Sequence, residues 1–200
     1  MIKPKTRIQQ RNEAIILSAS LDVFSQYGFR GSTLDQIATA SGLSKANVLY
    51  YFPSKEVIHT TLIAQLFKNW LDPLRELDRA GDPVEEILAY ARRKLDMSKR
   101  FPRESRLFAN EILQGAPHII DVLQGELRDL VHETHVVISG WVEDGAIKPV
   151  DPYHLIFSIW ALTQHYADFE VQVRAIMGSR DPFDSAGDYL ETLLRRLLAP

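Results

Sequence analysis

Residues 33–56, TLDQIATASGLSKANVLYYFPSKE, contain two short helical patterns separated by a glycine turn. Gly42 ends the first pattern where the chain must turn sharply, and Ser44 is placed to cap a second helix over 45–52. The apolar residues of the first pattern fall on one helical face: Leu34, Ile37 and Ala38. Two such helices, joined at a steep angle by a turn of about three or four residues, form a helix-turn-helix.

The start of the second helix is suited to reading DNA. In a helix-turn-helix, the second helix enters the major groove and its first residues reach base edges. Here those residues are Lys45, Ala46 and Asn47. Lysine can donate to guanine, asparagine can pair with adenine, and alanine can contact the methyl group of thymine. The segment therefore predicts binding of double-stranded DNA.

Charge is divided unevenly along this chain of 200 residues, whose net charge is −3. Residues 1–56 hold seven Lys and Arg against four Asp and Glu, whereas residues 57–200 hold sixteen against twenty-two. Four basic residues precede the first acidic one: Lys3, Lys5, Arg7 and Arg11. A cationic end on an acidic body is typical of a chain in which one domain binds phosphate, although an ordinary solvated charge gradient explains it equally well.

Several features exclude other classes of protein. The chain has no cysteine, no apolar leader and no apolar run near the ~18–20 residues of a membrane span, so we expect a cytoplasmic protein. It has no glycine-rich phosphate loop and no nucleophile motif, so we expect neither an enzyme nor a cofactor. The segment HETH, residues 132–135, lacks the spacing of a zinc motif, and Glu111 is interpreted as a helix-surface charge. No metal ion is therefore expected.

Helical spacing dominates the chain, and strand signals are nearly absent. We expect an all-α fold with a three-helix helix-turn-helix domain at 1–54 and a helical bundle at 55–200. Beyond the motif, the expected helices are 7–27 (stopped by Gly28), 55–79 with a kink at Pro73, 83–99, 102–114, 117–145 with a break near Gly125, 152–177 and 183–198.

Three segments of the N-terminal region resemble the TetR family of bacterial one-component regulators: FSQYGFRGST (24–33), IATASGLSK (37–45) and YYFPSKE (50–56). Every anchor residue of the family pattern is present without a gap, which makes the signal more specific than one short motif. The resemblance implies a TetR-like fold in which 1–54 binds DNA, while 55–200 binds a ligand and forms a homodimer. The two reading helices of such a dimer would face a palindromic operator.

The resemblance also implies DNA-contact roles for single residues. Thr33 can bind a phosphate through its hydroxyl and backbone N–H, and Tyr51 and Lys55 resemble the phosphate clamps of the family. Helical spacing turns one of two adjacent tyrosines inward, and we expect Tyr50 to be mainly a core residue. Leu49 stands where the family commonly has tyrosine, which leaves the base preference open. The candidate DNA-binding residues are Thr33, Ser44, Lys45, Ala46, Asn47, Tyr50, Tyr51 and Lys55.

Two segments of the C-terminal half resemble the RutR-type regulators of pyrimidine utilisation within this family: SRLFANEILQGAPHIID (105–121) and GWVEDGAIKPVDPYHLIFSIWALTQHYADF (140–169). The resemblance implies a repressor that releases DNA when uracil or thymine binds. We therefore expect a ligand-responsive repressor of pyrimidine catabolism. The alternatives are a TetR-type repressor that answers to an apolar or drug-like molecule, and a helical interaction module that does not bind DNA.

A uracil ring offers carbonyl acceptors, N–H donors and a flat apolar face, so its site needs aromatic stacking and a few matched polar groups. Trp160 and Gln164 are four residues apart and share a helix face. The residues alone favour Trp70 and Trp160 as ordinary core, whereas the resemblance favours them as ligand contacts. The candidate ligand-binding residues are Phe67, Trp70, Arg106, Asn110, Trp160 and Gln164, with Arg106 and Asn110 left open.

The helices expected at 117–145 and 152–177 carry more apolar side chains than one core face needs: Leu123, Leu127, Leu130, Val131, Ile138, Ile156, Ile159 and Trp160. Two such helices from each of two chains would form a four-helix dimer interface, as the resemblance implies. A ligand held by Trp70 and Phe67 would pivot the 55–79 helix and so change the spacing of the two reading helices.

Overall fold

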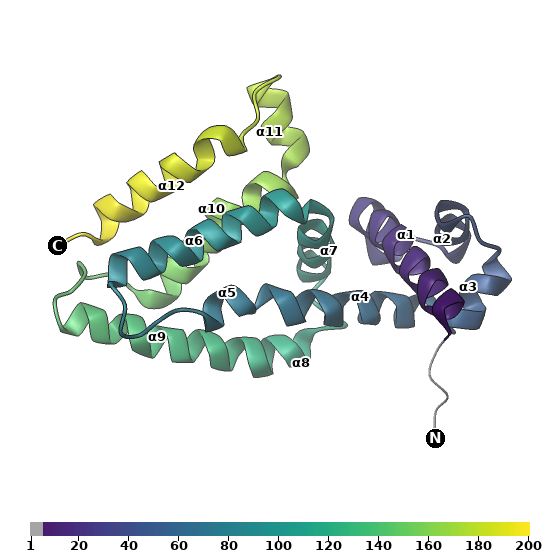
Figure 1. The fold of residues 1–200 in the computed structure, drawn as a ribbon, viewed down its shortest axis with the longest axis horizontal. Coiled ribbons are helices and arrows are strands. Elements are labelled where there is room, and N and C mark those ends of the chain that lie inside the picture. The colour runs from purple at the N-terminus through teal and green to yellow at the C-terminus, as the bar shows by residue number, and fades with distance from the viewer. Residues whose placement is uncertain (1–5) are drawn as a thin grey trace. The chain divides into compact units, whose positions relative to one another are not determined.

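The computed structural model describes residues 6–200, and within that range every regular element is helical (Figure 1). Lys3 and Lys5 of the basic N-terminal group lie outside the described residues. The helices are α1 (Arg7–Gly31), α2 (Leu34–Ser41), α3 (Lys45–Tyr51), α4 (Lys55–Trp70), α5 (Asp72–Arg75), α6 (Pro83–Arg100), α7 (Pro102–Leu113), α8 (Ile120–Val122), the π-helical η1 (Leu123–Leu127), α9 (Arg128–Glu143), α10 (Pro152–Asp168), α11 (Glu170–Met177) and α12 (Phe183–Leu198). The predicted all-α fold is confirmed.

The chain divides into two compact units. The first consists of Arg106–Ile119 with the described part of Met1–Lys68, and the second consists of Asn69–Ser105 and Ile120–Pro200. Helices α4 and α7 therefore each contribute residues to both units. The domain boundary expected after residue 54 stays a prediction.

Side-chain caps set the limits of the helices in the first unit. Thr6 caps α1 in a capping box with Gln9, and Thr33 caps α2 in the same way. Gly28 has φ 66°, in the left-handed region, and so interrupts the helical path of α1 where the sequence predicts a stop. The apolar faces of these helices meet in a core of buried residues: Ile16, Phe24, Ile37, Val48 and Ile58.

Helices α2 and α3 form the predicted helix-turn-helix. Gly42 adopts a left-handed conformation, with φ 68° and ψ 17°, after the last turn of α2. The backbone N–H of Leu43 donates to the carbonyl oxygen of Ala38 at 3.1 Å, which closes the end of that helix. Ser44 then caps α3, because its hydroxyl accepts a hydrogen bond from the backbone N–H of Asn47 at 3.2 Å.

The second unit has its own core, in which α6 packs against α10 and α12. Asp82 and Asp151 cap α6 and α10, and each is followed by a proline in the first turn. The buried side chains of this core include Ile87, Leu88, Tyr90, Ala91, Ile138, Ile156, Ile159, Leu190 and Leu194.

Three helix boundaries differ from, or refine, the expectation. The helix predicted at 55–79 ends at Trp70, and the short α5 begins at Asp72 with Pro73 in its first turn, where a proline is tolerated. The break expected near Gly125 is present, with ψ −106° at that glycine. The helix predicted at 152–177 divides at Phe169, which has φ −112° and ψ 31°. No glycine or proline marks that last break, so the sequence pattern missed it.

The expected dimer seam is also partly wrong. Four of its residues are buried in the core of their own unit and cannot face a second chain: Val131, Ile138, Ile156 and Ile159. They pack there because α6 lies against α10, and α5 and α10 lie against α9, within the same chain. Part of the excess of apolar residues that suggested a dimer seam is therefore needed to form the core of this multi-helix unit.

Candidate nucleic-acid interface and effector site

Helix α3 presents most of its surface to solvent. Val48 is its fully buried residue, and Ala46 and Asn47 are exposed at its start, on the side that a helix-turn-helix turns toward base edges. The described structure thus leaves these candidates free to contact DNA.

Lys45 forms an exposed ion pair with Asp35 of α2. Its Nζ lies 2.9 Å from the carboxylate oxygen, and at least half of each side chain is exposed. Exposed pairs of this kind contribute little to stability, about 0–1 kcal/mol. Lys45 can therefore leave Asp35 for a base or phosphate at small cost.

Thr33 is more constrained than the sequence suggests. Its backbone N–H donates to Oε1 of Gln36 at 2.7 Å, and its hydroxyl accepts from the N–H of Gln36 at 3.2 Å. The two groups that were expected to bind a phosphate therefore both face Gln36. A phosphate at this helix start would have to displace the Gln36 amide from the backbone N–H of Thr33.

The assignment of the two tyrosines is reversed. Tyr50 was expected to be mainly core, but it is 70% exposed. Tyr51 is the half-buried one, and its hydroxyl accepts a hydrogen bond from the side-chain amide of Asn12 on α1 at 2.9 Å. The expectation for Tyr50 is wrong because Val48 already fills the core side of this short helix, and Tyr50 stays a candidate DNA contact.

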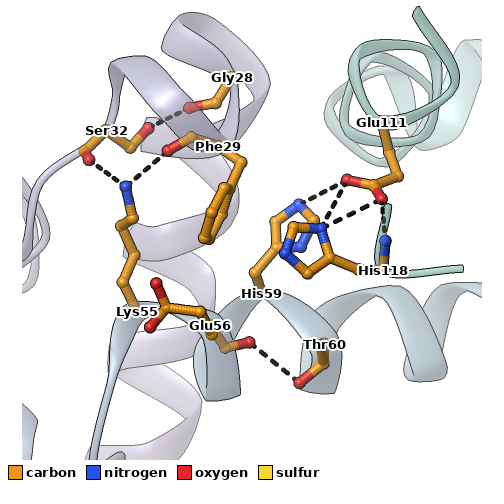
Figure 2. Close-up of polar contacts among 9 residues, drawn as sticks. All are labelled: Gly28, Phe29, Ser32, Lys55, Glu56, His59, Thr60, Glu111 and His118. Carbon is orange, nitrogen blue, oxygen red and sulfur yellow. Dashed lines mark hydrogen bonds and ion pairs between the residues drawn. The ribbon is translucent and has the colours of Figure 1, made fainter. Parts of the chain in front are cut away.

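Lys55 ties α4 to the end of α1 (Figure 2). Its ammonium donates to the carbonyl oxygens of Phe29 and Ser32, both at 2.7 Å, and lies 4.3 Å from the centre of the Phe29 ring. The expected role as a phosphate clamp stays a prediction. In the observed geometry, the ammonium donates to carbonyls at the end of α1, where helical carbonyls lack intrahelical donors, and it adds to the bond that Phe29 accepts from the backbone N–H of Ser32.

Three ligand candidates lie in the first unit. Phe67 is buried, and its ring meets that of Phe108 edge-on at 5.7 Å. Asn110 donates to the carbonyl oxygen of Ser25 at 3.3 Å, which ties α7 to α1. Arg106 is half-buried. Asn110 thus has a structural partner of its own.

The other three candidates, Trp70, Trp160 and Gln164, lie in the second unit. Trp70 is buried, and its indole N–H has no hydrogen-bond partner among residues 6–200. The ammonium of Lys94 lies 4.7 Å from the centre of its ring. Burial lowers the pKa of Lys94 to about 7, and the negative charge of Asp168 opposes this shift. An orphaned donor beside a buried cation is an arrangement that a polar ligand could satisfy.

Helices α6 and α10 carry further polar side chains that belong to the same cluster as Trp70 and Lys94. Tyr90 and Lys94 are one turn apart on α6, while Trp160, Gln164 and Asp168 follow at one-turn intervals on α10. The indole N–H of Trp160 donates to the Tyr90 hydroxyl at 2.6 Å, and Lys94 interacts electrostatically with Asp168. Half-buried Gln164 lies between these two links along α10.

Sequence reasoning missed Lys94, Tyr90 and Ser105 as parts of this cluster. The Ser105 hydroxyl donates to Oδ1 of Asp168 at 2.5 Å. A signal was present for Lys94, because it falls in the buried stripe of α6 with Ile87 and Ala91. A lysine at an inward position is costly unless it has a partner, so it marks a candidate site.

Comparison with known families identifies the chain. Residues 16–59 match the family described as "Bacterial regulatory proteins, tetR family", and residues 63–200 match "YcdC-like protein, C-terminal region". The chain belongs to the TetR family. It is thus a DNA-binding transcriptional regulator, and the relatives below are regulators as well.

Among curated TetR-family relatives, the HTH-type transcriptional regulator RutR of Escherichia coli K12 is 47% identical over 175 residues, which cover 88% of this chain and 82% of RutR. The HTH-type transcriptional repressor NicS of Pseudomonas putida is 29% identical over 150 residues, which cover 73% of this chain and 69% of NicS.

Solved structures share the TetR fold at lower identity. AibR in complex with isovaleryl coenzyme A and operator DNA superimposes with a TM-score of 0.72 at 18% identity, covering 94% of this chain and 99% of AibR. A TetR-like regulator from Rhodococcus sp. RHA1 gives 0.68 at 20% identity, covering 97% of each chain. These likenesses support the fold. Within residues 6–200, no helix has the length and apolar character that crossing a membrane requires.

Proposed function

We propose that this TetR-family regulator is a cytoplasmic repressor of pyrimidine catabolism that binds a palindromic operator as a homodimer and leaves it when uracil or thymine binds. The observation that supports it most is the buried polar cluster around Trp70 and Lys94, in a chain 47% identical to RutR over 88% of its length.

The polar groups of the second unit match a pyrimidine well. The indole N–H of Trp70 and the ammonium of Lys94 are donors for ring carbonyl oxygens. Asp168 and the amide of Gln164 can accept from ring N–H groups, and the Trp160 ring offers a stacking face. We propose these five residues as the effector contacts.

The same cluster argues against an apolar or drug-like effector. Burial of a lysine beside an unpartnered indole N–H is costly unless polar groups satisfy both. A purely apolar ligand would leave that cost in place. A small heterocycle with both donors and acceptors would remove it.

The homodimer requires an exposed apolar surface. Helix α12 buries one face in the core of its unit, yet it also exposes Tyr189, Leu193 and Leu197 at intervals of four residues. A helix that is apolar on two faces is suited to pack on both sides. We propose that the outer face of α12 forms the dimer seam, in place of the buried residues of α9 and α10.

Helix α4 offers a route from effector to DNA. It runs without interruption from Lys55 to Trp70, a length of about 22 Å at the ~1.5 Å rise of an α-helix. Lys55 holds the end of α1 next to the helix-turn-helix, and Trp70 borders the effector cluster. A pyrimidine that changes the preferred position of Trp70 would also change the preferred position of helix α4, which carries Lys55 at its other end. A typical coupling free energy is about 1–3 kcal/mol.

Two measurements test this function. A thermal-shift screen over nucleobases should show that uracil or thymine raises the melting temperature, because a ligand bound by the native state alone stabilises it. Operator DNA selected from a random pool should then bind more weakly when uracil is added at constant salt. Trp160→Ala and Gln164→Ala should abolish both effects. If operator affinity stays the same with every pyrimidine, the effector is wrong while DNA binding stands.

A further inference from the structure

The first unit contains a second buried polar cluster, formed by His59 of α4, Glu111 of α7 and His118 from the segment after α7 (Figure 2). One potential ligand atom of each residue lies within 4.8 Å of the others. Neither the base-reading residues nor the effector cluster includes them. Glu111, interpreted from the sequence as a helix-surface charge, is 3% exposed, so that interpretation is wrong.

The distances within this cluster are close to those around a bound cation. Nδ1 of His118 lies 3.2 Å from each carboxylate oxygen of Glu111, and Nε2 of His59 lies 3.7 Å from Oε2 of Glu111. Tetrahedral ligands with metal bonds of about 2.0–2.1 Å are about 3.3 Å apart. The two distances to Glu111 are within a few tenths of an ångström of this value, whereas the two imidazole nitrogens, which lie within 4.8 Å of each other, would have to come to a similar separation to share one ion.

The protonation of His59 and the orientation of Glu111 also suit metal binding. Burial lowers the pKa of His59 to about 4, against the opposing charge of Glu111, so its imidazole is neutral and can ligate at physiological pH. Its Nδ1 is buried without a hydrogen-bond partner in the described chain. The backbone N–H of His118 donates to Oε1 of Glu111 at 2.8 Å, which orients the carboxylate as an outer-shell partner would.

We propose that His59, Glu111 and His118 bind one first-row transition-metal ion, with Zn²⁺ the best match to two imidazoles and a carboxylate. A water molecule would take the remaining position, as in three-ligand zinc sites. The side chains of His59 and Glu111 are each 1% exposed, whereas that of His118 is 20% exposed and gives the ion a way in.

The surroundings link this ion to the DNA-reading part of the same unit. The Phe29 ring lies 4.9 Å from the His59 ring and 4.6 Å from the His118 ring, and the ammonium of Lys55 lies over it (Figure 2). A metal bond between α4 and α7 would hold His59 in place one turn from Lys55. The ion would thus stabilise the support of the helix-turn-helix rather than contact DNA.

The proposal is tested with Co²⁺ on the full-length, metal-stripped protein. We expect one equivalent to bind and to give the visible absorption bands of a site with four or five ligands, and Zn²⁺ to remove them. His118→Ala and Glu111→Gln should each weaken binding at least about tenfold. The matched control His154→Ala removes an exposed imidazole of α10 and should change nothing.

Melting temperatures show whether each variant is still folded, and so separate a loss of metal binding from a loss of structure. Excess Zn²⁺ should raise the melting temperature of the wild type and of His154→Ala, but not of His118→Ala. Absence of the Co²⁺ bands in the wild type would overturn the proposal and leave His118 and Glu111 as a hydrogen-bonded pair. Equal Co²⁺ affinity in His118→Ala, Glu111→Gln and wild type would overturn it too. Neither outcome depends on the pyrimidine proposal, because the ligands belong to another unit.

Discussion

Trp160 donates its indole N–H to the hydroxyl of Tyr90 at 2.6 Å, which joins α10 to α6 across seventy positions of sequence. Burial raises the pKa of Tyr90 above its ordinary value, so the hydroxyl stays protonated and accepts through its lone pairs. The single N–H of Trp160 is therefore occupied within the protein. Of the two tryptophans proposed as effector contacts, Trp70 is the one with an N–H to offer a ligand, while Trp160 offers its ring face.

Tyr90→Phe tests this link. The change removes the acceptor and leaves the partly buried N–H of Trp160 unpaired, so the free energy of unfolding should fall by about 1–3 kcal/mol. Urea denaturation measures it. Tyr27→Phe, at a half-exposed tyrosine, is the matched control and should stay within about 0.5 kcal/mol of wild type. Equal midpoints for both variants would show that the bond contributes nothing.

Lys94 should make stability depend on pH. Its pKa falls from 10.5 to about 7 in the folded protein, so between these values the unfolded chain binds more protons than the folded one. The free energy of unfolding should therefore rise with pH from about 7 toward 10, by at most ~1.4 kcal/mol per pH unit. Below pH 7 the lysine is charged in both states, and the cost of its burial is fully present.

Lys94→Met should remove that rise, because methionine fills a similar volume without a charge. Unfolding free energies of the wild type and the variant should diverge between pH 7 and 10, with the variant flatter. Lys148→Met, at an exposed lysine, controls for general alkaline effects. Parallel pH curves for Lys94→Met and wild type would contradict the lowered pKa.

Local signals in the sequence were sufficient to predict the helix-turn-helix formed by α2 and α3. Gly42 and Ser44 fix where α2 ends and α3 begins, because each acts through its own backbone or its nearest neighbours. Tyr50 and Tyr51 were assigned the wrong way round, since which of two adjacent residues turns inward depends on how α1 packs. That packing shows in the bond from Asn12 to Tyr51, which joins residues far apart in the sequence.

The polar clusters depend even more on distant partners. His59 and Glu111 are 52 positions apart, and no spacing rule connects them. Lys94 gave a usable hint through its inward helical position, but Asp168, which opposes its pKa shift, could not be paired with it from sequence. Resemblance indicated Trp70 and Trp160, yet it could not show that one indole N–H is satisfied and the other is not.

Lys55→Ala and Lys45→Ala should have different effects on stability. Lys55→Ala removes the ammonium that donates to the carbonyls of Phe29 and Ser32, so we expect a loss of about 1–3 kcal/mol in unfolding free energy. Lys45→Ala breaks only an exposed pair, so stability should change little.

DNA binding separates the two lysines further. Lys45→Ala should weaken operator affinity, by about 1–3 kcal/mol if it donates to a guanine. Binding isotherms at several salt concentrations provide the comparison. If Lys55 is the phosphate clamp that the TetR resemblance implies, Lys55→Ala should have a salt slope about one unit smaller than wild type, and an unchanged slope would contradict that role.

A charge placed on the outer face of α12 should convert the dimer to a monomer. Leu193 is partly exposed between Tyr189 and Leu197, whereas Leu190 and Leu194 on the other face are buried in the core. Leu193→Glu would place a charge in the middle of an apolar seam, and a buried unpaired charge is costly enough to dissociate a dimer. Light scattering after size exclusion should give twice the chain mass for wild type and a single chain mass for Leu193→Glu.

Leu113→Glu is the matched control, since Leu113 is an exposed leucine of α7 in the other unit. It should stay dimeric. Circular dichroism should show unchanged helix content in both variants, because neither side chain is part of a core. Dissociation should also weaken operator binding strongly, since one reading helix then meets one half-site. A Leu193→Glu protein that remains dimeric would move the seam to another apolar surface of the second unit.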